Sequence, residues 1–96
     1  EESFEKLESS LLFYLEKLDY SLEQVSEIKI QLLSRAENLS SNPYRGQYEP
    51  YLKLLNKGHR RLVEGYFKII YKIEGETVYI TDFFETRQNP TKMKGQ

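Results

Sequence analysis

The chain of 96 residues has no cysteine and a single histidine, His59. The lack of cysteine excludes disulfide bonds, thiolate metal sites and cysteine nucleophiles. One histidine without cysteine cannot build a histidine-based metal cluster. No serine near His59 lies in a Gly-x-Ser-x-Gly turn, so the sequence offers no nucleophilic triad. We therefore expect no metal and no cofactor.

Long apolar runs are also missing, since no stretch approaches the roughly 20 residues that cross a bilayer. No basic segment followed by an apolar run opens the sequence, which argues against a secretory signal. The five glycines are scattered, so they form no phosphate-binding loop. Together with the lack of cysteine, these absences are compatible with a reducing cytosol. We expect a cytoplasmic protein without a membrane partner.

What is present fits one folded domain, with 39% hydrophobic and 30% charged residues. The net charge of −1 conceals an asymmetry between the two halves. Residues 1–42 hold four basic and nine acidic side chains, a balance of −5, whereas residues 43–96 hold ten basic and six acidic ones, a balance of +4. A basic half suits an anionic partner such as nucleic acid or an acidic protein segment, or else forms a solvated charged surface.

The last third of the chain carries the strongest structural pattern. Two β-rich runs flank a short turn centred on Glu74 and Gly75, where glycine can take positive φ. In the first run, apolar residues alternate with a mixed, basic set. The apolar set is Phe67, Ile69, Tyr71 and Ile73, and the mixed set is Tyr66, Lys68, Ile70 and Lys72. This period of two predicts a β-hairpin with one apolar face that needs a cover.

The first forty residues predict that cover. Apolar residues at spacings of three and four indicate a helix over residues 3–18: Phe4, Leu7, Leu11, Leu12, Leu15 and Leu18. After a break at 19–20, Ser21 and Gln24 have the capping-box spacing that starts a second helix. Its inner side would carry Leu22, Val25, Ile28, Leu32, Leu33, Ala36 and Leu39. So short a connection predicts an antiparallel helical hairpin.

The middle of the chain is less regular. Residues 40–43 end the second helix at Pro43. Residues 44–58 are predicted to be irregular, with a helical turn or a short strand around 51–55, and residues 59–64 to form a strand. The expected fold is a single α+β domain, 1–96, in which a helical hairpin (about 3–40) packs on one face of an antiparallel sheet (about 59–84) of at least three strands. A polar, basic tail (86–96) follows, and the other face of the sheet stays partly open and carries Lys68 and Lys72.

The candidate functional residues are basic. Arginines at strand ends suit phosphate or carboxylate recognition, because the guanidinium group bonds two oxygens at once. The set is His59, Arg60, Arg61, Lys68, Arg87 and Lys92. The alternative is that Arg60 or Arg61 simply pairs with Glu64 or Glu85 on the surface. The carboxylates are expected mostly on the outer faces of the helices, which disfavours a paired acid–base site. The eight tyrosines either stack on bases or fill core edges.

Several ordered segments resemble the RelE/ParE superfamily of bacterial type II toxins. They are Asn42-Pro43-Tyr44-Arg45-Gly46, Arg60-Arg61-Leu62-Val63, residues 65–75, Val78-Tyr79-Ile80 and Phe84-Glu85-Thr86-Arg87-Gln88-Asn89-Pro90-x-Lys92. The resemblance covers nearly the whole chain and implies the same α+β fold. It also implies a β-strand before the first helix. This sequence opens at Glu1 without one, and we expect the natural protein to have a few more residues there.

The long helical hairpin is more similar to ParE-like members, which inhibit DNA gyrase. The resemblance therefore implies a plasmid-stabilisation toxin that inhibits growth by protein–protein binding and forms a hetero-oligomer with a cognate antitoxin. Whether it is also an enzyme stays open. The antitoxin would lie beside the sheet, burying apolar side chains and pairing acidic residues with Arg60, Arg61 and Arg87. The residues expected to bind antitoxin or target are His59, Arg60, Arg61, Lys68, Arg87, Asn89 and Lys92.

Two alternatives stay open. RelE-like members cleave mRNA on the ribosome without a metal, and in that case Arg61, Lys68 and Arg87 would surround the scissile phosphate. That branch usually has an aromatic residue near its C-terminus, whereas no aromatic residue follows Arg87 here. The second alternative is an inactive homologue that only binds its antitoxin.

Overall fold

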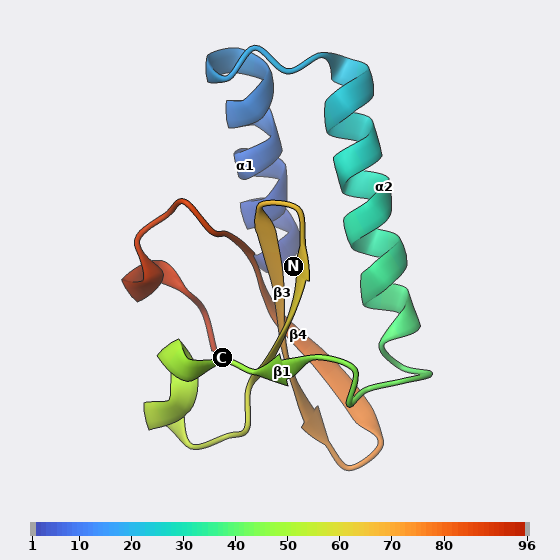
Figure 1. Cartoon of the computed structure of the whole chain (residues 1–96), viewed down its shortest axis with the longest axis vertical. Helices are drawn as coiled ribbons and strands as arrows, with labels where there is room; N and C mark the ends of the chain where they lie inside the picture. Colours follow the sequence, from blue (N-terminus) through green and yellow to red (C-terminus); the bar gives the residue numbers. More distant parts are fainter. Residues whose placement is uncertain (1, 96) are drawn as a thin grey trace.

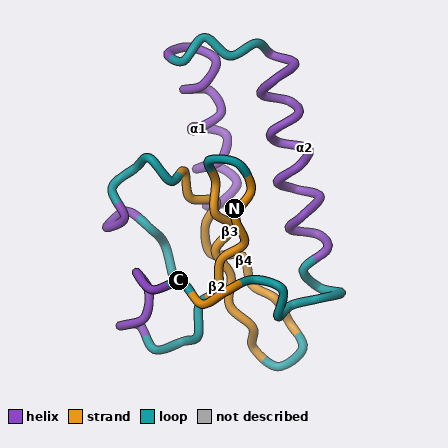
Figure 2. Tube along the Cα trace, in the orientation of Figure 1, coloured by secondary structure: helices purple, strands orange, loops and turns teal. Residues whose placement is uncertain are grey.

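The structure is a computed structural model that describes residues 2–95. Its elements, in chain order, are α1 (Glu2–Lys17), α2 (Leu22–Asn38), β1 (Gln47–Tyr48), the 3₁₀ helix η1 (Pro50–Leu55), β2 (Arg60–Glu64), β3 (Phe67–Glu74), β4 (Thr77–Glu85) and the 3₁₀ helix η2 (Pro90–Lys92). The strands form one antiparallel sheet in the order β1-β2-β3-β4. The two helices form a hairpin on one face of the sheet (Figure 1, Figure 2). This confirms the predicted α+β fold.

The turn between α1 and α2 explains why the two helices run antiparallel. Tyr20 donates its backbone N–H to the Tyr14 carbonyl, 3.1 Å away, across Asp19, which has a φ of 59°. A left-handed residue at this position is the usual end of a helix. Ser21 then caps α2, since its hydroxyl accepts the Gln24 N–H while the Gln24 amide accepts the Ser21 N–H. The predicted capping box is therefore confirmed.

The main core lies between the helices and the sheet. Its buried members are Leu7, Leu11, Tyr14, Val25, Leu32, Leu39, Leu62, Phe67, Ile69, Tyr71 and Phe83. Three residues predicted to face inward, Phe4, Leu12 and Leu22, are instead exposed. The buried stripe of α1 follows the spacing of Leu7, Leu11 and Tyr14, which turns Leu12 toward solvent. Burial of Tyr14 is possible because its hydroxyl reaches a carboxylate on β4.

The second face of the sheet was predicted to be partly open, and that prediction is wrong for its centre. A smaller core forms there from Leu52, Ile70, Phe84 and Met93. Leu52 comes from η1 and Met93 from the segment after η2, so both segments cover the sheet from this side. These segments cover the sheet because exposure of the Ile70 and Phe84 side chains to water would be unfavourable. Lys68 and Lys72 do share this face, at its margins.

β1 and η1 both arise from residues 44–58, where the sequence predicted irregular structure with a helical turn or a short strand around 51–55. The 3₁₀ helix η1 confirms the helical turn, whereas β1 was not predicted. Gly46 precedes β1 at a point of close approach, because a Cβ atom there would lie 2.5 Å from the Arg61 carbonyl oxygen and 2.6 Å from the Tyr71 hydroxyl. Tyr71 fixes this connection: its hydroxyl accepts the Gly46 N–H and donates to the Pro43 carbonyl. The segment thus joins α2 to the sheet edge by hydrogen bonds to a core residue.

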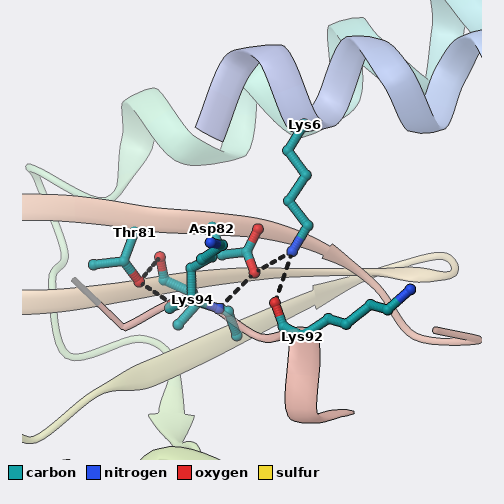
Figure 3. A network of polar contacts seen from close by, with 6 residues as sticks. Lys6, Thr81, Asp82, Lys92 and Lys94 are labelled. Atoms are coloured by element: carbon teal, nitrogen blue, oxygen red, sulfur yellow. Dashed lines mark hydrogen bonds and ion pairs between the residues drawn. The ribbon is translucent and has the colours of Figure 1, made fainter. Parts of the chain in front are cut away.

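The C-terminal strap, residues 90–95, crosses the second face rather than forming a free polar tail. β4 has a bulge at Thr81, whose hydroxyl donates to the Lys94 carbonyl at 2.8 Å. Asp82, fully buried, accepts the Lys94 N–H and the Lys6 ammonium, each at 2.9 Å. Figure 3 shows Lys6 reaching from α1 to this carboxylate and to the Lys92 carbonyl. The strap is therefore tied to both β4 and α1.

Neither α-helix, within residues 2–95, combines the length and the apolar character needed to cross a bilayer.

Candidate functional site

Two buried carboxylates, Glu49 and Glu85, bind three of the six predicted basic residues in separate clusters. We call the first the Glu49 cluster: Glu49, Arg61 and Lys68. The Lys68 ammonium lies 2.9 Å from Glu49 Oε1, and Arg61 Nε lies 4.0 Å from the same oxygen. Arg61 also donates to the Tyr48 carbonyl and to the Gln47 amide. Glu49 is buried, and its side chain also caps η1 by accepting the Tyr51 N–H.

The aromatic–arginine cluster consists of Tyr44, Tyr48 and Arg60, at the β1 edge of the sheet. Register pairs Arg60 with Tyr48 and Tyr71, so it faces the helical side, opposite Arg61. Its guanidinium lies 4.3 Å from the Tyr48 ring centroid and 5.0 Å from that of Tyr44, and it donates to the Gly46 carbonyl. Both rings are largely exposed, by 66% and 68% respectively. The cluster is therefore a preformed cation–aromatic surface.

The Glu85 cluster consists of Tyr14, Tyr66, Glu85 and Arg87, and lies where β4 ends beneath α1. Tyr14 donates its hydroxyl to Glu85 Oε2 at 3.0 Å and accepts from Arg87 Nη2 at 2.8 Å. Arg87 binds Glu85 through both Nε and its backbone N–H. Its guanidinium is also 4.2 Å from the Tyr66 ring centroid. Four contacts thus hold Arg87 in one orientation.

Burial and this network shift the ionisation of three groups. Burial, reinforced by the Glu85 charge, raises the pKa of the Tyr14 hydroxyl to about 12. Burial alone would raise the pKa of Glu85, but hydrogen bonds from Arg87 and Tyr14 outweigh it and hold that pKa below its ordinary value. The hydrogen bond to Glu85 raises the pKa of Arg87. A neutral tyrosine, a carboxylate and a guanidinium therefore coexist over the whole physiological pH range.

The other three predicted site residues have local structural contacts. His59 is buried, and its Nε2 lies 2.7 Å from the Gly95 carbonyl in the strap. Burial lowers the pKa of its imidazole. Asn89 caps η2 by accepting the Thr91 N–H, and the Lys92 carbonyl accepts from Lys6 while its side chain is exposed. His59 thus connects the strap to the start of β2, and its buried side chain does not lie on a surface that a partner could contact.

The structure brings Arg61 and Lys68 together at Glu49, but it holds Arg87 at a different carboxylate. The surface pairing of Arg60 or Arg61 with Glu64 or Glu85 is wrong, since Glu64 pairs with Arg35 and Glu85 with Arg87. Sequence reasoning missed Tyr14, Glu49 and Asp82, and it named Glu85 only as a surface partner of Arg60 or Arg61. The signal for Asp82 and Glu85 was present, because Asp82 interrupts an apolar strand and Glu85 ends it, and a buried charge needs a partner.

Within residues 2–95, no group of three or more histidine, aspartate or glutamate side chains is arranged to hold a metal ion. The positive residues near β1 border a groove of about 520 Å³ that is lined by Tyr48, Glu49, Lys53, His59 and Arg61 among others. A second cavity lies beside the Glu85 cluster. The site chemistry is therefore that of ion pairing and stacking.

Comparisons of the chain with protein-family models, with curated proteins and with solved structures gave no match.

Proposed function

We propose that this chain is the toxin component of a type II toxin–antitoxin system, of the ParE-like branch of the RelE/ParE superfamily. It acts in the cytoplasm by binding a protein target, DNA gyrase, and a cognate antitoxin neutralises it in a hetero-oligomer. The ordered sequence segments and the helical hairpin on an antiparallel sheet support this assignment.

The observation that carries the proposal is the exposed aromatic–arginine cluster. Tyrosine and arginine are the residues most enriched at the energetic centres of protein interfaces. Here Arg60 is already stacked on Tyr44 and Tyr48, so little side-chain entropy is lost when a partner docks. Residues 43–61 hold five basic side chains and one acidic one, which favours a partner segment rich in carboxylates.

The state of the three candidate nuclease residues favours binding over mRNA cleavage. Arg61 and Lys68 contact the Glu49 carboxylate, and Arg87 contacts Glu85. A scissile phosphate would have to compete with these carboxylates for the same cations, in two separate places. His59 is no substitute as a general base, because its Nε2 is engaged with the Gly95 carbonyl.

Expression of the chain in bacterial cells without antitoxin tests the proposal. We expect growth arrest in which DNA synthesis falls before protein synthesis, and inhibition of supercoiling when the purified chain is added to gyrase. A variant carrying both Tyr48→Ala and Arg60→Ala should lose at least about tenfold in inhibition, because both members of a stacked pair are removed. Lys17→Ala, on an exposed residue at the far end of α1, is the matched control.

The outcomes separate the three branches. Discrete mRNA cleavage at ribosomal A-site codons, with protein synthesis lost first, would replace the gyrase assignment by the endoribonuclease. Normal growth with tight antitoxin binding would leave an inactive homologue. Normal growth without antitoxin binding would contradict the toxin assignment altogether.

A further inference from the structure

A cavity of about 510 Å³ lies between α1 and the segment that follows β4, away from the aromatic–arginine cluster. α1 contributes Ser9, Ser10 and Phe13 to one wall, and the other wall includes Arg87, Gln88 and Lys92. This volume is within the range of sites for small organic ligands. The family resemblance places Arg87 and Lys92 among the residues expected to bind antitoxin or target, but it assigns no small ligand to this cavity.

The polar groups of this cavity have more donors than acceptors. Glu85 is the one carboxylate in the lining, and both its oxygens are occupied: Oε1 accepts the Arg87 backbone N–H, and Oε2 accepts the Tyr14 hydroxyl and Arg87 Nε. Arg87 Nη1 and the Lys92 ammonium have no hydrogen-bond partner among residues 2–95. A ligand that matches this lining must supply acceptors and negative charge.

Ser10 points to the same kind of ligand. The residue is only 8% exposed and lines the cavity, yet its hydroxyl makes no hydrogen bond within residues 2–95. Its oxygen is not among the described buried side-chain atoms that lack a partner, so the hydroxyl is open to the cavity and to water rather than sealed in the core. Ser10 therefore offers a donor that an incoming oxygen atom can satisfy.

The remaining lining is apolar. Phe13 is 52% exposed although it is a large hydrophobic residue, and Leu18 and the Tyr14 ring continue the same wall. Arg87 is preorganised opposite this wall, because Glu85, Tyr14 and the Tyr66 ring already fix its guanidinium. Fixed donors facing an apolar wall reduce the entropy that a small ligand loses on binding.

We propose that this cavity binds a small organic oxyanion, a carboxylate or phosphate group carried on an apolar body. The oxyanion lies among Ser10, Arg87 and Lys92, and the apolar body packs on Phe13. Both head groups share this chemistry, since each presents several acceptor oxygens with negative charge.

Titration of the isotope-labelled full chain, followed by amide chemical shifts, tests the site with four probes. Benzoate and phenyl phosphate carry the oxyanion and the ring, inorganic phosphate lacks the ring, and benzyl alcohol lacks the charge. We expect saturable shifts at Ser9, Ser10 and Gln88 for benzoate or phenyl phosphate, with a Kd on the order of 1 mM. The tighter of these two identifies the preferred head group. Benzyl alcohol and inorganic phosphate should each bind at least about tenfold more weakly, because each lacks one of the two contacts.

Two variants localise the effect. Lys92→Gln should weaken the better probe about tenfold through loss of a charge-assisted contact, and Ser10→Ala should also weaken it. Lys53→Gln, an exposed lysine on η1, should leave the Kd unchanged. The inference is overturned if neither anionic ring compound saturates these amides, if benzyl alcohol binds equally well, or if Lys92→Gln and Lys53→Gln have the same effect. None of these outcomes depends on growth arrest or gyrase inhibition.

Discussion

His59 and Asp82 are buried polar residues on the second face of the sheet, and each holds the strap. Nδ1 of His59 and Oδ1 of Asp82 have no hydrogen-bond partner among residues 2–95. The other polar atom of each side chain contacts the strap. His59 Nε2 is hydrogen-bonded to the Gly95 carbonyl, and Asp82 Oδ2 accepts the Lys94 N–H. The contact between His59 and Gly95 is therefore sensitive to protonation of the imidazole.

The stability of the fold should therefore fall as the pH drops below about 6.5. Burial lowers the pKa of His59 from its ordinary 6.5, and the positive charges of Lys72 and Lys57 act in the same direction. Because the unfolded chain then takes up a proton before the folded chain does, the free energy of unfolding decreases from pH 6.5 downward until the folded pKa is reached. Urea unfolding at pH 7.5 and 5.5 measures this loss.

The matched variant is His59→Gln, whose amide can donate to the Gly95 carbonyl without titrating. It should lose less stability than the wild type between these two pH values. Glu85 does not affect this comparison, because its pKa lies below its ordinary 4.5. Its contribution to the free energy of unfolding is therefore lost only at pH values below those compared here. An equal loss in the two proteins would show that His59 is not the titrating group.

At the residue scale, the sequence identified which basic side chains lie at strand ends but not what they contact. Lys68 and Arg87 were recognised, whereas their partners Glu49 and Glu85 were not. Glu49 lies 19 residues before Lys68, so sheet register rather than sequence spacing brings these two together. Glu85 lies only two residues before Arg87, a local pair that the sequence analysis overlooked. His59 was misassigned to the partner surface, because its burial depends on the strap.

At the element scale, the strap is the segment that links the N-terminal helix to the sheet's second face. Lys6 of α1 reaches the buried Asp82 and also donates to the Lys92 carbonyl, at 3.1 Å. Its ammonium also lies 5.4 Å from the Phe84 ring centroid. One lysine therefore contacts the strand, the strap and the second core together.

Removal of the Lys6 charge should be costly because it leaves Asp82 buried and unpaired. We expect Lys6→Met to lower the free energy of unfolding by about 3 kcal/mol, the usual scale for breaking a buried pair on one side. Lys29→Met is the control: Lys29 pairs with Glu8 across the helices at 2.5 Å, but both side chains are exposed. That variant should cost less than about 1 kcal/mol. Chemical denaturation measures both, and equal costs would contradict the buried-pair argument.

Elements with a strong period were predicted well from sequence. α2 with its capping box and the alternation along β3 are examples, because local spacing alone specifies them. β1 and the strap were not, since each is short and gains its form from packing on residues distant in sequence. For η1 the sequence offered a helical turn or a short strand, and the structure has the helical turn. Met93 was the one apolar residue in the tail, and a single such residue does not indicate which face it covers.

At the scale of the whole molecule, the helical hairpin extends past the sheet. The connection between α1 and α2 lies at one end of the long axis, beyond the strands (Figure 1). A cavity of about 360 Å³ separates this end of the hairpin from the turn between β2 and β3, with Tyr20, Gln24 and Tyr66 in its lining. Packing is therefore looser here than over Leu32, which is fully buried.

Amide hydrogen exchange should reveal this difference. We expect amides of residues 25–28 in α2 to exchange at least about tenfold faster than those of residues 69–71 in β3. Of the buried core residues on α2, local opening of the hairpin end exposes Val25 but leaves Leu32 packed. Residues 32–35 of α2 serve as the internal control, since they lie over the sheet and Arg35 bonds the Val63 carbonyl and Glu64. Equal protection along α2 would contradict a loosely packed end.

The layered arrangement of hairpin and sheet was predictable because an apolar strand face demands a cover. The second, smaller core was not predictable to the same degree, since Ile70 and Phe84 alone do not say whether a partner or the chain itself covers them. The structure resolves this in favour of the chain itself.

The joint contact of Lys6 and the strap at Asp82 has a mechanical consequence. The first turns of α1 and the strap both contact the Asp82 carboxylate in β4. A force that pulls the two ends of the chain apart therefore acts on the Lys6–Asp82 ion pair before it acts on β2 or β3. The strap would peel away first, at low load, while the ladder between β3 and β4 resists.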